Sequence, residues 1–168
     1  MLDLVLVEPE IPPNTGNVAR LSVALEARLH LIEPLGFRID ERSVRRAGVD
    51  YWDRVKLAVH ADFETFIDRV APRRLLYLSA HAETLHTAIA YEPGDALVFG
   101  KETAGLDPTL GERHPGQWVR IPHWGPMRSL NLSNAVAVVA YEAMRQLEQR
   151  GLVPPPVARL PDLPLREG

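Results

Sequence analysis

Residues 1–33 read MLDLVLVEPEIPPNTGNVARLSVALEARLHLIE, and this stretch decides the fold class. Leu2–Val7 and Leu29–Glu33 are short apolar runs without alternation, a pattern typical of strands buried on both faces of a parallel sheet. Val18–Ala27 lies between them and follows the helix-capping sequence Asn-Thr-Gly. A strand, a helix and a strand in this order predict two parallel strands joined by a crossover helix.

The rest of the chain continues this alternation. We expect further strands at Val55–Val59, Leu75–Leu78, Ala96–Phe99 and Trp118–Ile121, and further helices at Ser43–Ala47, Asp62–Val70 and Asn131–Gln149. In the last of these helices the apolar residues at 132, 136, 139, 140, 143 and 147 form one stripe. The pattern predicts an α/β domain with a mostly parallel sheet flanked by helices.

The chain of 168 residues suits a single domain. We assign residues 1–150 to this domain and residues 151–168 to a proline-rich C-terminal tail. The tail begins GLVPPPVARLPDLP and cannot continue the last helix, because proline lacks the N–H donor and clashes with the preceding turn. An extended segment is expected, either as a free end or docked on a neighbour.

Composition excludes several classes of site. The chain has no cysteine, which excludes disulfides, thiolate metal sites and a cysteine nucleophile. The six histidines show no metal-ligand spacing, so no metal is expected. No apolar stretch reaches the ~18 residues of a membrane span, and the N-terminus lacks the basic segment of a signal peptide. We therefore expect a cytoplasmic protein without membrane association.

The charge balance is ambiguous about nucleic acid. A net charge of −3 and a pI near 6.1 are not typical of a nucleic-acid-binding domain. However, all but Lys56 and Lys101 of the 19 basic residues are arginine, whose guanidinium pairs with phosphate through two parallel hydrogen bonds. A compositional bias of the genome or a bias linked to thermostability is the alternative explanation.

Three polar loops follow predicted strands, and such loops share one edge of a parallel sheet, where ligands bind. In the first, EPEIPPNTGNVAR (8–20), Asn14, Thr15 or Asn17 can cap the next helix beside N–H groups that hold an anion. Arg20 lies less than two helical turns beyond Asn14 and can meet a phosphate or carboxylate. The alternative is a plain cap and a surface arginine.

The other two loops have different chemistry. In FGKETAGL (99–106), two glycines allow the backbone to approach a ligand, although the spacing is not that of a P-loop. In IPHWGPMRSLNLSN (121–134), Ser129, Asn131 and Ser133 offer hydroxyl and amide groups at the start of the last helix, where capping is the alternative role. Signatures of serine hydrolases, zinc proteases and ordinary dinucleotide-binding folds are absent from the sequence. His30 lies within a predicted strand and is expected to be structural.

Five segments in order carry a resemblance: EPEIPPNTGNVARL (8–21), RRAGVDY (45–51), FGKETAGL (99–106), IP (121–122) and RSLNLSNAV (128–136). They resemble the SPOUT class of RNA methyltransferases, and most closely its TrmL/YibK-type branch of tRNA wobble-nucleotide 2′-O-methyltransferases. The resemblance covers residues 1 to about 150. It implies an α/β fold with a C-terminal trefoil knot, an S-adenosylmethionine pocket within the knot, and a homodimer whose active sites combine both subunits.

The resemblance also implies a reaction and a partner. The expected reaction is 2′-O-methylation of the wobble cytidine or uridine in the anticodon region of tRNA. Two alternatives stay open: the same chemistry on another tRNA or ribosomal RNA nucleotide, and a non-catalytic RNA-binding protein with the same fold.

Roles for single residues follow from the matching positions. The expected cofactor contacts are Leu78, Gly100, Ile121, Ser129 and Leu130, and the expected catalytic residues are Asn14, Arg20, Glu102, Ser129 and Asn131. Arg45, Arg46 and Tyr51 are candidates for RNA contact. In the family the residue matching Arg20 is the proposed activator of the 2′-hydroxyl. Because a guanidinium rarely gives up its proton, we favour a role for Arg20 in holding a phosphate and orienting that hydroxyl. Trp124 is expected either to stack on a base or to pack on the partner subunit.

Overall fold

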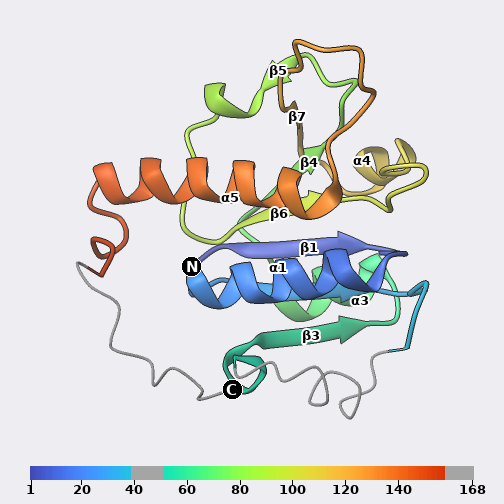
Figure 1. Ribbon diagram of the computed structural model, residues 1–168, viewed down its shortest axis with the longest axis horizontal. Helices are drawn as coiled ribbons and strands as arrows, with labels where there is room; N and C mark the ends of the chain where they lie inside the picture. The colour runs from blue at the N-terminus through green and yellow to red at the C-terminus, as the bar shows by residue number, and fades with distance from the viewer. Residues whose placement is uncertain (39–50, 158–168) are drawn as a thin grey trace, which may run out of the picture.

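The computed structural model describes residues 1–38 and 51–157, and Figure 1 shows its arrangement. Within these ranges seven strands form one sheet in the order β3-β2-β1-β6-β4-β7-β5. Every pairing between neighbouring strands is parallel. The strands are β1 (Asp3–Val7), β2 (Arg28–Ile32), β3 (Lys56–His60), β4 (Arg74–Leu78), β5 (Thr84–Leu85), β6 (Asp95–Phe99) and β7 (Gln117–Arg120). The predicted parallel α/β class is confirmed.

Helices cover both faces of this sheet. The α-helices are α1 (Pro12–Ala24), α3 (Phe63–Val70), α4 (Thr109–Arg113) and α5 (Leu132–Gln149), with short 3₁₀ helices at Trp52–Arg54 (η1) and His86–Ala88 (η2). Helices α1 and α5 lie side by side and share one hydrophobic core cluster, while α3 and α4 contribute to a second cluster (Figure 1).

Strand β1 shows why its sequence is apolar without alternation. Leu4 and Leu6 belong to the cluster that contains α1 and α5, whereas Val5 belongs to the cluster that contains α3. All three side chains are fully buried. Successive side chains of a strand point to opposite faces, so a strand covered on both sides must be apolar at every position.

Helix α5 follows its predicted stripe closely. Its buried residues are Leu132, Val136, Val139, Ala140, Ala143 and Leu147, the six positions predicted from the sequence. The helix ends at Gln149, as predicted, and the backbone at Gly151 has a φ of +67°.

Three elements, β5, α4 and α1, differ most from the sequence prediction. Strand β5 has only two residues and α4 only five, too short to leave a periodic signal. Helix α1 begins at Pro12, six residues before the predicted start, with prolines in its first two positions. Proline fits there because the first turn of a helix has no partner for its N–H groups. The predicted helix at Ser43–Ala47 lies outside the described residues.

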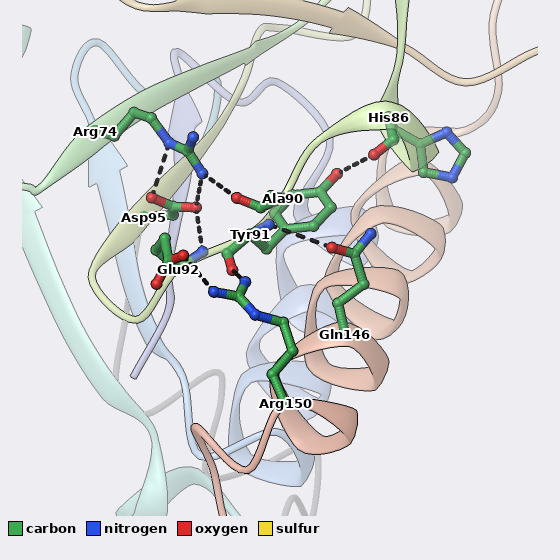
Figure 2. A network of polar contacts seen from close by, with 8 residues as sticks. All are labelled: Arg74, His86, Ala90, Tyr91, Glu92, Asp95, Gln146 and Arg150. Carbon is green, nitrogen blue, oxygen red and sulfur yellow. Dashed lines mark hydrogen bonds and ion pairs between the residues drawn. The ribbon is translucent and has the colours of Figure 1, made fainter.

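The two central strands each begin with a buried aspartate paired to an arginine on the adjacent strand. Asp3 pairs with Arg28 of β2, and Asp95 pairs with Arg74 of β4. Figure 2 shows that the second pair belongs to a larger network, in which Arg150, just after α5, donates to the Tyr91 carbonyl and pairs with Glu92. The network fixes the C-terminal end of α5 to the turn that leads into β6.

His30 is structural, as predicted. Its ring is buried between Asp3 and His60, with Nε2 3.0 Å from Asp3 Oδ1 and Nδ1 3.0 Å from His60 Nε2. Phe66 of α3 packs against both imidazoles. Burial, followed by the charges of His30 and Arg69, lowers the pKa of His60 below its ordinary value.

Candidate active site

A pocket of about 1030 Å³ lies at the carboxyl ends of the central strands. The segments that line it follow β1, β4, β6 and β7, and they include residues 78–83, 99–106 and 128–132. The three polar loops of the sequence therefore meet at one edge of the sheet, as the parallel topology predicts.

The loop after β6 is folded tightly on itself. The Gly105 N–H donates to the Lys101 carbonyl at 2.8 Å, and Gly105 has a φ of +71°. A Cβ atom at Gly100 would lie 2.1 Å from the Gly105 carbonyl carbon. Glycine is thus required at position 100 by contact between two backbone segments of the loop.

Glu102 joins this loop to the start of α1. Its carboxylate accepts hydrogen bonds from the backbone N–H groups of Glu10 (2.8 Å) and Ile11 (3.2 Å) and from Asn14 Nδ2 (2.8 Å). A carboxylate of the chain itself therefore binds the N–H groups that precede α1, whose first two residues are prolines without an N–H.

These contacts decide what Glu102 can do chemically. Burial opposes ionisation of the carboxyl, but the hydrogen bonds from Asn14 and from the backbone N–H groups outweigh it and lower the pKa of Glu102. A carboxylate that is held ionised by three donors is a weak base. Glu102 is consequently suited to positioning the two loops rather than to accepting a proton.

A second set of contacts closes the same two loops, and the sequence analysis missed it. Lys101 Nζ lies 2.6 Å from Glu8 Oε2, and Glu10 accepts hydrogen bonds from the backbone N–H and the hydroxyl of Thr103. The two acids lie within the EPE sequence and their partners lie within the KET sequence. Opposite charges in these two motifs were the available signal.

Asn14 and Asn131 extend the connection to α5. Asn131 Nδ2 donates to Asn14 Oδ1 at 2.9 Å. Asn131 Oδ1 accepts from the backbone N–H groups of Ser133 and Asn134, so Asn131 is also the N-cap of α5. Capping and a cross-loop contact, which were alternatives in the sequence, are both present. The expected capping of α1 by Asn14, Thr15 or Asn17 is wrong, because the N-cap is Ile11 and no side chain caps this helix.

All five expected cofactor residues line the pocket: Leu78, Gly100, Ile121, Ser129 and Leu130. Asn14, Glu102 and Asn131 line it as well. The wall offers leucine and isoleucine side chains beside serine and asparagine, which suits a ligand with one apolar and one polar part. His123 also lines the pocket, and its Nε2 atom is buried without a hydrogen-bond partner among the described residues.

Arg20 does not lie in this pocket. Its side chain is exposed on α1, and its guanidinium carbon lies 5.6 Å from the centre of the Tyr51 ring. Six residues of helix rotate the side chain by about 600°, so Arg20 points roughly 120° away from Asn14. Arg20 is therefore a surface arginine of its own subunit. The Tyr51 hydroxyl donates to the Gly16 carbonyl at 3.4 Å, which places Tyr51 against the same helix.

The remaining expectations concern RNA contacts, metal ligands and membrane spans. Arg45 and Arg46, two of the candidates for RNA contact, lie outside the described residues. Among residues 1–38 and 51–157 no group of three or more His, Asp or Glu side chains is arranged to hold a metal ion. No helix within these ranges is both long and apolar enough to cross a membrane.

Comparison with known proteins identifies the class. Residues 1–141 match the SpoU rRNA methylase family, and the chain belongs to this family. It is 47% identical over 154 residues to the tRNA (cytidine(34)-2′-O)-methyltransferase of Escherichia coli K12, an alignment that covers 91% of this chain and 98% of the relative.

Solved structures agree with this relationship. A protein studied for 2-OH methylation of C/U34 on tRNA has a TM-score of 0.81 and 46% identity, covering 89% of this chain and 98% of that one. The SpoU methyltransferase AviRb from Streptomyces viridochromogenes, in complex with AdoMet, has a TM-score of 0.75 and 26% identity, covering 87% of this chain and 57% of that one.

Proposed function

We propose that this protein transfers a methyl group from S-adenosylmethionine to the ribose 2′-oxygen of the wobble cytidine or uridine of tRNA. The observation that carries the proposal is the pocket at the carboxyl ends of β4, β6 and β7, built from the motifs at 99–106 and 128–132. The supporting relationship spans nearly the whole length of a tRNA (cytidine(34)-2′-O)-methyltransferase.

The pocket lining supports the expected cofactor contacts. Leu78, Gly100 and Ile121, which end or follow three neighbouring strands, would hold the adenine and ribose through backbone groups, with Ser129 and Leu130 on the adjoining wall. When bound, S-adenosylmethionine supplies an electrophilic methyl group on a sulfonium. Gly100 allows the backbone of Gly105 and Leu106 to pack closely against this wall.

The chain's own residues contribute orientation. Glu102, Asn14 and Asn131 form one connected set of hydrogen bonds between the loop after β6, helix α1 and helix α5. Transfer of a methyl group depends mainly on in-line placement, and well-oriented reactions gain ~7–11 kcal/mol from such placement. We assign positioning roles to these three residues, and a place beside the acceptor ribose to Ser129.

Arg20 would hold the phosphate next to the reacting ribose and orient its 2′-hydroxyl. Its guanidinium is outside the pocket of its own subunit, so it would serve the pocket of a second copy. A homodimer meets this requirement. Val138 and Tyr141 of α5 are exposed apolar side chains, which suits burial against a partner.

Further parts of the proposal rest on the resemblance. Arg45, Arg46 and Tyr51 would contact the RNA. Tyr51 lies beside Arg20, which supports a shared RNA-binding surface. The loops at 99–106 and 121–134 and the start of α5 would form a trefoil knot. Residues 151–168 would form a separate proline-rich tail, and the enzyme would act in the cytoplasm.

The test is methyl transfer from labelled S-adenosylmethionine to total tRNA from cells that lack this protein, followed by nucleoside mapping. The proposal predicts label in a 2′-O-methylated pyrimidine at the first anticodon position. Label in a 2′-O-methylated nucleotide at another position would support the reaction and contradict the proposed target nucleotide. A parallel assay uses ribosomal RNA. Label on ribosomal RNA but not on tRNA would make ribosomal RNA the substrate, as the name of the SpoU rRNA methylase family implies.

A further inference from the structure

The loop between β7 and α5 carries an exposed indole beside the pocket. Trp124 is 92% exposed, and it lies between His123 and Arg128, which both line the pocket. Met127 in the same loop is 72% exposed. An indole buries a large area when it finds a partner, so its full exposure at the edge of a site indicates a contact that forms on binding.

The charge around this loop favours a polyanion as the partner. Residues 113–141 contain no aspartate or glutamate, although the chain has 22 acidic residues, and this is its longest stretch without one. Arg120 and Arg128 lie within the stretch. Arg128 forms no ion pair with another described residue, so its charge is available to a ligand.

We propose that Trp124 is a stacking platform for a nucleobase of the RNA substrate at or next to the methylated ribose, and that Arg128 contacts the adjoining phosphate. This inference rests on the proposed function and deepens it. A ribose placed at the pocket carries its own base and its neighbours within a few ångströms, and these bases are unpaired in an anticodon loop. Stacking on an aromatic side chain combined with arginine contacts to the backbone is the usual way in which proteins hold single-stranded bases.

The charge pattern favours a base over a protein surface. Trp124 lies between Arg120 and Arg128 in a segment of sequence without acidic residues, while Glu83 and Glu102 line the pocket beside it, and cations near an exposed indole favour stacking on a base. A subunit interface would instead bury a continuous apolar patch with few charges at its centre.

The experiment compares Trp124→Ala, Trp124→Phe and a control, Leu152→Ala, which truncates an exposed apolar side chain beyond α5. Each is assayed on an anticodon stem–loop, with kcat, KM for RNA and KM for S-adenosylmethionine measured separately. Trp124→Ala is expected to raise KM for RNA by roughly tenfold, within the range for loss of one stacked base, and to leave KM for the cofactor unchanged. Trp124→Phe should restore most of the loss, and Leu152→Ala should behave as the wild type.

The base is located with stem–loops that are abasic at position 33, 34 or 35. At the stacked position the abasic RNA should raise KM for the wild type and remove the difference between wild type and Trp124→Ala. Unchanged KM for RNA in Trp124→Ala, or an equal loss on all three abasic RNAs, would overturn the inference while the wild type remains active. Dissociation of the Trp124→Ala dimer, measured by light scattering, would assign the indole to the partner subunit and also overturn it. A wild type that neither binds nor methylates any stem–loop would contradict the proposed function itself.

Discussion

The side-chain amide of Asn131 donates a 2.9 Å hydrogen bond to Asn14 across 117 residues of chain. Asn131 caps α5, and Asn14 lies in the first turn of α1 and also donates to Glu102. Asn14 therefore links three segments at the pocket: α1, the start of α5 and the loop after β6. This arrangement predicts that small changes at Asn14 disturb both stability and activity.

Asn14→Asp tests this prediction with almost no change in size. The new carboxylate would face Glu102 in place of a donor 2.8 Å away, so two like charges would replace a hydrogen bond. We expect the free energy of unfolding at pH 7 to fall by about 1–3 kcal/mol in urea titrations, with a loss of methyl transfer. Asn17→Asp, on the exposed part of the same helix, is the matched control and should change stability little.

The ionised state of Glu102 gives a prediction about acid. Because its pKa is lowered in the folded protein, its contribution to stability is present above its unfolded pKa near 4.5 and is lost as the pH falls below it. Glu102→Gln should therefore cost about 1–2 kcal/mol at pH 7 and much less near pH 3. Urea unfolding at both pH values measures this, with the exposed Glu148→Gln as the control. An equal cost at both pH values would mean that the charge of Glu102 is irrelevant.

The lowered pKa of His60 predicts a second effect of pH on stability, closer to neutrality. Its pKa is lowered in the fold, so the unfolded chain binds more protons and stability falls as the pH drops below about 6.5. His60→Gln should flatten the dependence of the free energy of unfolding on pH between about 6.5 and 5. The exposed His81→Gln should leave the slope as in the wild type. A slope unaffected by His60→Gln would contradict the assignment.

The position of Arg20 outside its own pocket predicts complementation between subunits. Arg20→Ala should abolish methyl transfer while calorimetry still detects S-adenosylhomocysteine binding. Ser129→Trp places a large side chain in the pocket and should abolish cofactor binding. Random mixing of the two variants gives half mixed dimers with one intact site each, so about a quarter of wild-type activity should return. Recovery of no activity would place Arg20 and the pocket in the same subunit or exclude the dimer.

Local sequence signals predicted most of the strands and the core face of α5. Leu4, Val5 and Leu6 are buried on the two faces of the sheet. A short unbroken apolar run in a domain of this size is typical of such a strand. Helix α5 has 18 residues, long enough for its apolar period to stand out. Strand β5 was missed because two residues carry no period, and its pairing with β7 depends on contacts far along the chain.

The site shows the limit of local patterns more clearly. The pocket-lining residues Leu78, Gly100 and Ile121 were found because they match a family, and Asn14 because it stands in a polar loop. The contacts of Glu102 and Lys101 join segments about 90 residues apart, which spacing along the chain cannot reveal. The direction of Arg20 depends on the start of α1 at Pro12, and the sequence analysis placed that start too late.

The acceptor atom is tested with two anticodon stem–loops that differ only at the sugar of position 34, one with a ribose and one with a 2′-deoxyribose. Purified protein and labelled S-adenosylmethionine should label the first RNA and leave the second unlabelled, although both should bind. Equal labelling of the two RNAs would show that the methyl group goes to a base or to another ribose, and would contradict 2′-O-methylation of the wobble nucleotide.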